Sequence, residues 1–193
     1  LTPVYHKLLI NKFKINNPTI ILNIGGISNY TYCFNDTLTA KDIGPGNVLM
    51  DEYLKKTKGI DYDKNGDIAS SGNINKDIIN QFYEHEFYNV QQKHSFDRNE
   101  FDFSFVKGLE FEDALATLTY FTALIISQNI KKNFDNEIEI ILCGGGRKNL
   151  ALVNHIKKLL KYKIKLIDEF SIDGDFIESQ AFAYLSIRSY LKK

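Results

Sequence analysis

The chain has few of the features that mark several large classes of protein. It has two cysteines, Cys33 and Cys143, which lie far apart and lack the spacing of a metal site. Basic and acidic residues both number 24, so the net charge is zero and no basic field attracts nucleic acid or anionic lipid. The apolar runs are too short to cross a bilayer. These absences favour a reduced, cytoplasmic protein that binds neither nucleic acid nor membrane.

The composition is otherwise that of a globular protein. At 193 residues, with 44% hydrophobic residues, the chain can form one large domain or two small ones with a real core. It begins at Leu1 rather than methionine, and its first residues show no signal-peptide pattern. We expect a processed form or a fragment of a longer protein.

The order of the expected elements indicates a mixed sheet. The hydrophobic spacing predicts, in chain order, a helix at 4–13, strands at 19–24, 30–34 and 38–43, helices at 47–54, 78–87 and 111–134, a strand at 137–143, a helix at 150–160, a strand at 163–167 and a helix at 177–191. Three adjoining strands followed by helix-separated strands predict an α/β protein with helices on both faces of the sheet. This is the ribonuclease-H-like half of the actin-type ATPase fold, and with no internal repeat the chain supplies one half.

Three glycine-rich turns, each directly after an expected strand, are the strongest signal in the sequence. They read Asn23-Ile24-Gly25-Gly26-Ile27-Ser28-Asn29, Asp42-Ile43-Gly44-Pro45-Gly46-Asn47 and Cys143-Gly144-Gly145-Gly146-Arg147-Lys148-Asn149. Glycine lets the backbone approach a ligand closely, and the N–H groups at a helix start favour an anion. Together the turns predict a surface that handles phosphate.

The first two turns suit phosphate groups. The N–H groups of Gly25 and Gly26, with the Ser28 hydroxyl, could hold a phosphate, and the alternative is a tight hairpin. The second turn opens a helix capped by Asn47, and we expect its first-turn N–H groups to point outward. Asp42 before it could orient a hydrated Mg²⁺ or only accept hydrogen bonds within the turn.

The third turn suits a flat group. Three consecutive glycines, Gly144 to Gly146, are costly to order, and bare backbone there could receive an adenine and its ribose. The alternative is a closely packed strand-to-helix crossover. The turn lacks both the Gly-Lys-Ser/Thr ending of a P-loop and the dinucleotide fingerprint. Asn149 is expected to cap the next helix, and Cys143 to act as a small buried apolar group.

Two acidic segments allow more than one interpretation. Residues 63–67 (Asp-Lys-Asn-Gly-Asp) resemble the start of a calcium loop but lack its closing glutamate, so a structural turn is predicted. Glu178 falls in the first turn of the last helix. It could stabilise the helix dipole or bind sugar hydroxyls.

Taken together, these residues resemble the anhydro-N-acetylmuramic acid kinase family. Besides the three turns, the matching stretches are Ser95-Phe96-Asp97-Arg98, Ala116-Thr117-Leu118-Thr119, and Gly174-Asp175 with Glu178, Gln180 and Ala181-Phe182-Ala183. The resemblance implies an actin-type sugar kinase that uses ATP and Mg²⁺. Such an enzyme hydrolyses the ring of 1,6-anhydro-N-acetylmuramic acid and phosphorylates the freed 6-hydroxyl to N-acetylmuramic acid 6-phosphate in cell-wall recycling.

The resemblance also assigns roles to residues. It implies that Asn23 to Ser28 face the phosphates. With the second turn added from its own sequence, the candidate phosphate-binding residues are Asn23, Gly25, Gly26, Ser28, Asp42, Gly44, Gly46 and Asn47, and Asp42 is the candidate metal ligand. The resemblance implies adenosine binding by Cys143, Gly144, Gly145, Gly146 and Asn149, and sugar binding by Glu178. The segment Ser95–Arg98 would lie near the cleft.

The resemblance further implies that part of the enzyme lies outside this chain. The family's catalytic aspartate would precede Leu1, and so would the N-terminal lobe with its Gly-Thr-Ser phosphate loop. We therefore expect residues 1–193 to form one C-terminal lobe that is inactive alone. The alternative is a degenerate or split, non-catalytic nucleotide-binding remnant. An absent lobe would leave apolar surface exposed, which favours either association, for example into a homodimer, or poor solubility.

Overall fold

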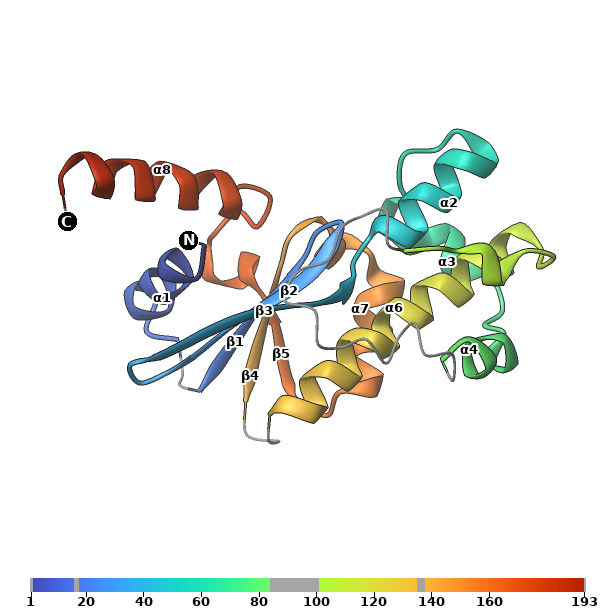
Figure 1. Cartoon of the computed structure of the whole chain (residues 1–193), viewed down its shortest axis with the longest axis horizontal. Helices are drawn as coiled ribbons and strands as arrows, with labels where there is room; N and C mark the ends of the chain where they lie inside the picture. Colours follow the sequence, from blue (N-terminus) through green and yellow to red (C-terminus); the bar gives the residue numbers. More distant parts are fainter. Residues whose placement is uncertain (1, 16–17, 84–100, 135–137, 193) are drawn as a thin grey trace.

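A five-stranded mixed sheet forms the centre of the molecule (Figure 1). The computed structural model describes residues 2–15, 18–83, 101–134 and 138–192. Its strands are β1 (Thr19–Ile24), β2 (Ile27–Phe34), β3 (Thr37–Pro45), β4 (Glu139–Cys143) and β5 (Lys163–Leu166), in the order β3-β2-β1-β4-β5. The pairs β1–β2 and β2–β3 are antiparallel, whereas β1–β4 and β4–β5 are parallel. The predicted mixed sheet is confirmed.

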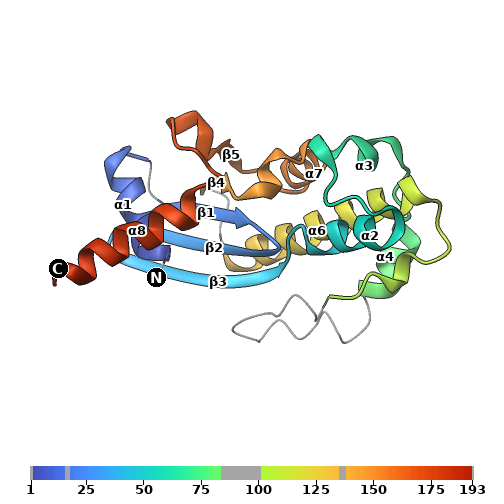
Figure 2. The ribbon, with the colours of Figure 1, turned by 90° about the horizontal axis from the view of Figure 1, so that it is seen from above.

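Helices cover both faces of this sheet (Figure 2). They are α1 (Thr2–Lys12), α2 (Val48–Lys58), α3 (Asp67–Ser71), α4 (Lys76–Tyr83), α6 (Phe111–Asn133), α7 (Leu150–Leu159) and α8 (Ile177–Tyr190). Each predicted helix has a counterpart, although the end of the helix expected at 78–87 lies outside the described residues. Among the described residues, no helix combines the length and apolar character needed to cross a membrane.

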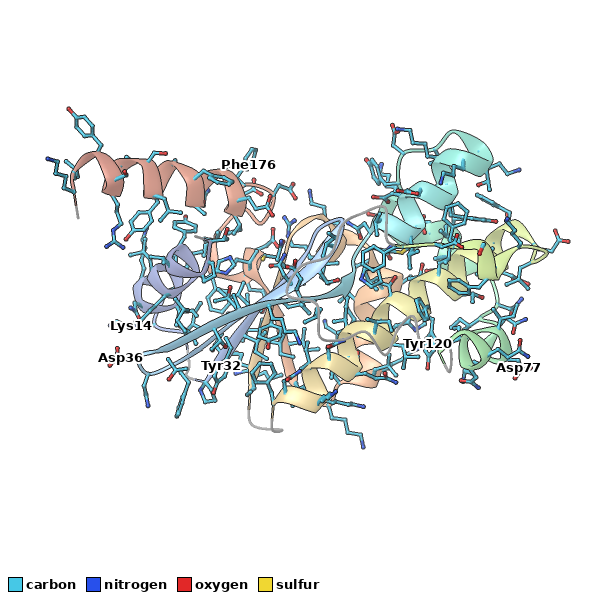
Figure 3. All side chains as sticks on the ribbon, viewed as in Figure 1. Lys14, Tyr32, Asp36, Asp77, Tyr120 and Phe176 are labelled. Atoms are coloured by element: carbon cyan, nitrogen blue, oxygen red, sulfur yellow. The ribbon has the colours of Figure 1, made fainter. Side chains whose placement is uncertain are left out.

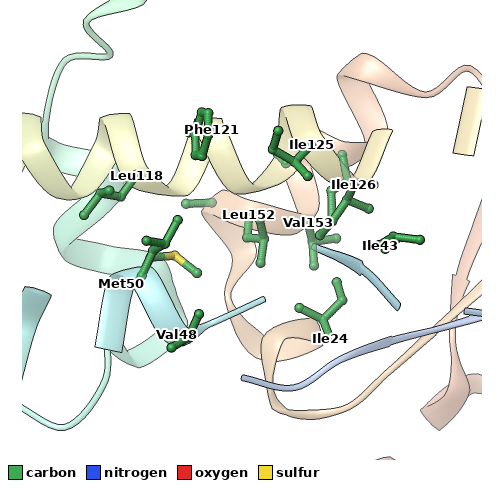
Figure 4. Packing of buried hydrophobic residues seen from close by; sticks show 14 of the residues in the cluster. Ile24, Ile43, Val48, Met50, Leu118, Phe121, Ile125, Ile126, Leu152 and Val153 are labelled. Atoms are coloured by element: carbon green, nitrogen blue, oxygen red, sulfur yellow. The ribbon is translucent and has the colours of Figure 1, made fainter. Parts of the chain in front are cut away.

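The larger core lies between the sheet and α2, α6 and α7 (Figure 4). Alternate residues of β1 face it, including the fully buried Ile20 and Leu22, while Ile21 faces the opposite side. A strand buried on both faces needs apolar side chains on both, which explains the run Ile20-Ile21-Leu22 in β1. Phe121 of α6 is fully buried at the centre of this packing.

The smaller core lies between the sheet and α1 and α8, and it leaves much of α8 uncovered. In α8 only Ile177 and Ala181 are buried. Phe182 and Ile187, two apolar positions of the predicted closing helix, are 61% and 60% exposed. Phe176 before the helix is also exposed (Figure 3). Exposed aromatic and aliphatic side chains are typical of a surface that another lobe or subunit covers.

Candidate functional site

The first two glycine turns are joined through their backbones. The N–H groups of Gly46 and Val48 donate to the carbonyl of Gly26 at 2.8 and 3.2 Å, and that of Asn47 donates to Gly25 at 2.7 Å. A Cβ atom on Gly46 would collide with the Gly25 carbonyl oxygen, so only glycine allows this approach. The expectation that the first-turn N–H groups of α2 point outward is therefore wrong for Val48, which opens the helix.

Three side chains of these turns lie differently from the predicted arrangement. Within the described part of the chain, Asn47 forms no side-chain cap bond to α2, so the predicted cap is absent. Ser28 is fully buried and its hydroxyl donates to the Pro45 carbonyl, so a phosphate would have to displace that bond. Asp42 lines a separate groove of about 280 Å³ together with Thr2. The phosphate and metal roles of these residues stay predictions.

The third turn passes tightly over the end of β1. Gly144 has φ +79°, and a Cβ atom there would collide with Asn23 Oδ1. A Cβ atom on Gly146 would collide with the buried side chain of Ile24. At Gly145, by contrast, the nearest described atom outside its own turn is Asn47 Nδ2, at an ordinary contact distance of 3.7 Å. Gly145 therefore presents bare backbone to open space.

Asn23 links the first turn, the third turn and α8. Its side-chain amide donates to Glu178 Oε1 at 3.3 Å, across 155 positions of sequence. Its carbonyl oxygen faces the thiol of Cys143 at 3.8 Å. Burial raises the pKa of Cys143 to about 12, so the thiol is a neutral, packed group. Glu178 remains exposed in the first turn of α8, where its carboxylate can accept hydrogen bonds from a ligand.

Arg147, which the sequence did not single out, holds the third turn to the segment before α8. Its side chain is 3% exposed. The guanidinium donates two hydrogen bonds to Asp168 at 2.7 and 2.9 Å and one to Asp175 at 2.6 Å. It donates a further bond to the Gly144 carbonyl at 3.0 Å. Hydrogen bonding to Arg147 lowers the pKa of Asp168 and of Asp175. A Cβ atom on Gly174 would collide with this guanidinium. A bidentate arginine fixes geometry as well as charge, so the turn is held rigidly.

A cavity of about 430 Å³ opens beside Gly145. Asn47 and Met50 line it on the side of α2, and Lys148 and Asn149 line it on the side of the third turn. Asn149 accepts a hydrogen bond from the N–H of Leu152 at 3.0 Å, which confirms the predicted cap of α7. The volume lies in the range of small-ligand pockets.

A further wall of the cavity is formed by residues 61–65. The Asp63 carboxylate accepts hydrogen bonds from the N–H groups of Ile68 and Ala69, both at 3.0 Å. Lys64–Gly66 forms a 3₁₀ turn, and a Cβ atom on Gly66 would collide with Asn149 Oδ1. The predicted structural turn is confirmed, but its place beside the third glycine turn was not foreseen.

The structure thus unites most, but not all, of the predicted site. Asn23, Glu178 and the turns of Gly25 and Gly145 meet at one edge of the sheet, whereas Asp42 lies in its own groove. Ser95–Arg98 lies outside the described residues. No group of three or more histidine, cysteine, aspartate or glutamate side chains suited to a metal occurs in the described ranges. A Mg²⁺ ion held mainly by water and phosphate needs only one or two carboxylates.

Comparisons with known proteins agree with this architecture. The family profile "Anhydro-N-acetylmuramic acid kinase" matches residues 1–192. The chain is 50% identical over 204 residues to the anhydro-N-acetylmuramic acid kinase of Pelagibacter ubique, covering all of this chain and 54% of that protein. It is 35% identical over 195 residues to that of Zymomonas mobilis, covering all of this chain and 53% of that protein.

One solved structure supports the fold. The activator of 2-hydroxyisocaproyl-CoA dehydratase from Clostridium difficile, solved with bound ADPNP, superimposes with a TM-score of 0.55 at 16% identity. The match covers 92% of this chain and 64% of that one. The fold is therefore of the actin-like ATPase type, as predicted from the order of the elements. The chain spans about half the length of the curated relatives it matches, and it belongs to the anhydro-N-acetylmuramic acid kinase family.

Proposed function

We propose that residues 1–193 form the C-terminal lobe of an ATP-dependent kinase that hydrolyses and phosphorylates 1,6-anhydro-N-acetylmuramic acid. One observation carries the proposal. Two glycine turns meet at Asn23, and the bare backbone of Gly145 opens onto a cavity of about 430 Å³. Family membership supplies the reaction.

In this proposal the nucleotide lies across the first and third turns. Its adenine and ribose occupy the cavity against Gly145, where a side chain would take their place. The phosphates extend toward Gly25 and Gly26, whose backbones are half-exposed. Phosphoryl transfer depends mainly on positioning and charge neutralisation, and Mg²⁺ would supply part of the latter. Asp42 is the candidate carboxylate for that ion.

The sugar lies nearer to α8 in this proposal. The Glu178 carboxylate accepts hydroxyl hydrogen bonds, and the amide of Asn23 orients it. Because Asn23 also contacts the third turn, one side chain couples the sugar position to the nucleotide position. Opening the anhydro ring needs a general base within hydrogen-bond reach of the attacking water. We assign that base to the other lobe, in a cytoplasmic enzyme of cell-wall recycling.

A coupled ADP-release assay tests the proposal in two proteins. One is the 193-residue chain, and the other is a chimera in which this chain replaces the matching half of the Pelagibacter ubique relative. We expect no sugar-dependent ADP release from the chain alone and clear release from the chimera. The chimera with Gly145→Val is the matched control and should lose ATP affinity while staying folded.

Other outcomes contradict the proposal in distinct ways. Turnover by the chain alone would refute its assignment as a lobe without the catalytic base. A folded chimera that binds ATP without turnover would favour the alternative, a degenerate nucleotide-binding remnant. Unchanged ATP binding in the Gly145→Val chimera would refute the adenosine assignment.

A further inference from the structure

Residues 61–65 form a wall of the cavity that the proposed function leaves without a role. Tyr62 in this segment lines the same cavity as Gly145, and 63% of the residue is exposed. An exposed aromatic ring at the wall of a pocket offers a large, rigid apolar face on which a ligand can pack. The bare backbone of Gly145 and the ring of Tyr62 thus supply two surfaces suited to a flat molecule.

The segment that carries Tyr62 is held firmly in place. Asp63 caps α3 through two N–H groups, those of Ile68 and Ala69. Gly66 packs directly on the side chain of Asn149, which caps α7 next to the third glycine turn. The backbone of Tyr62 is therefore fixed relative to Gly145, and little ordering is needed when a ligand binds.

The charges of the cavity indicate which part of a nucleotide enters it. Four aspartates line the cavity, Asp51, Asp61, Asp63 and Asp175, against two lysines, Lys64 and Lys148. Lys148 is already paired with Asp175. An excess of carboxylates repels phosphate groups but accepts hydrogen bonds from hydroxyls and amino groups. The neutral base and ribose fit this lining, whereas the triphosphate does not.

We propose that Tyr62 stacks on the base of the nucleotide whose other side lies against Gly145. The inference rests on the proposed function, since it names a residue that determines affinity at the nucleotide site. Stacking of a base on an aromatic ring is sequence-tolerant, because every base has a π-face. Tyr62 therefore strengthens binding of nucleotides relative to inorganic polyphosphate, and its ring rather than its hydroxyl is required.

The chain contains no tryptophan, which allows a clean spectroscopic test. Tyr62→Trp places a single indole at the cavity, and Tyr190→Trp places one at the far end of α8, where Tyr190 is 87% exposed. We expect ATP to change the emission of Tyr62→Trp, with excitation beyond the nucleotide's absorbance, and tripolyphosphate to leave it unchanged. Neither compound should change the emission of Tyr190→Trp.

Calorimetry separates this inference from the proposed function. We expect Tyr62→Ala to weaken ATP binding by about tenfold and Tyr62→Phe to leave it unchanged, with Tyr190→Ala as the control for a lost exposed tyrosine. If the wild-type chain binds ATP but Tyr62→Ala binds it equally well, the stacking role is wrong and the nucleotide site stands. If neither the wild-type chain nor the chimera binds ATP, the proposed function fails and this inference fails with it.

Discussion

Two neighbouring glycines of the third turn should respond in opposite ways to the same substitution. In Gly146→Ala the added Cβ atom would overlap the side chain of Ile24 and lie 2.9 Å from Asn47 Oδ1. Ile24 is fully buried at the end of β1 and cannot move aside without disturbing the core. Overpacking of this kind costs about 3 kcal/mol, which corresponds to a fall in Tm of about 6 to 12 °C for a domain of this size.

In Gly145→Ala the added Cβ atom meets an ordinary contact, Asn47 Nδ2 at 3.7 Å, and the backbone needs no positive φ. The substitution removes conformational freedom from the unfolded chain, so we expect stabilisation by up to about 1 kcal/mol. Thermal and urea unfolding of both variants, compared with the wild type, measures the difference. Equal stability of the two variants, or a larger loss in Gly145→Ala, would refute the described geometry of the turn.

Three further substitutions or reactions test the surroundings of this turn. Arg147→Met should lower the free energy of unfolding by about 2 kcal/mol at pH 7. Because Arg147 lowers the pKa of Asp168 and Asp175, its contribution exists above their unfolded pKa of about 3.9 and disappears as the pH falls through the lower folded values. The difference in the free energy of unfolding between the wild type and Arg147→Met, measured by urea unfolding, should therefore be smaller at about pH 3 than at pH 7. A difference that stays constant with pH would contradict the ion pairing. Asn149→Ala should cost about 1 kcal/mol through loss of the α7 cap, and Asn149→Ser should restore most of it. Cys143 should resist a disulfide reagent at pH 8 in the native chain and react on denaturation, so rapid native labelling would contradict its burial.

Much of the fold can be predicted from the sequence because the local hydrophobic patterns match the burial of the same residues in the structure. The isoleucine-rich sequence of β1, Thr19 to Ile24, indicates a strand covered on both faces, and the structure buries all six residues. The long apolar pattern at 111–134 likewise predicts a helix, and α6 buries most of its residues in the larger core. Local sequence also identifies Asn149 as the cap of α7, whereas the same residue type at Asn47 forms no cap bond to α2.

The site itself depends on contacts that no local pattern encodes. The N–H group of Val48 donates to the carbonyl of Gly26, which lies on another turn. The sequence of the helix start alone does not indicate that this N–H group already has a partner. Arginine is usually exposed, and the burial of Arg147 follows from carboxylates more than twenty positions away. The segment of Asp63 was correctly interpreted as a turn, but only the packing of Gly66 on Asn149 brings it to the cavity.

The proposed function depends above all on a nucleotide lying against the bare backbone of Gly145. NMR titration of ATP into the ¹⁵N-labelled chain tests this placement through the chemical-shift changes of individual backbone amides. The method also detects the weak binding expected of a single lobe. We predict the largest shifts at Gly145, Asn47 and Tyr62, with Tyr190 at the end of α8 unchanged. Absence of shifts at these three amides, or equal shifts at Tyr190, would contradict this placement of the nucleotide.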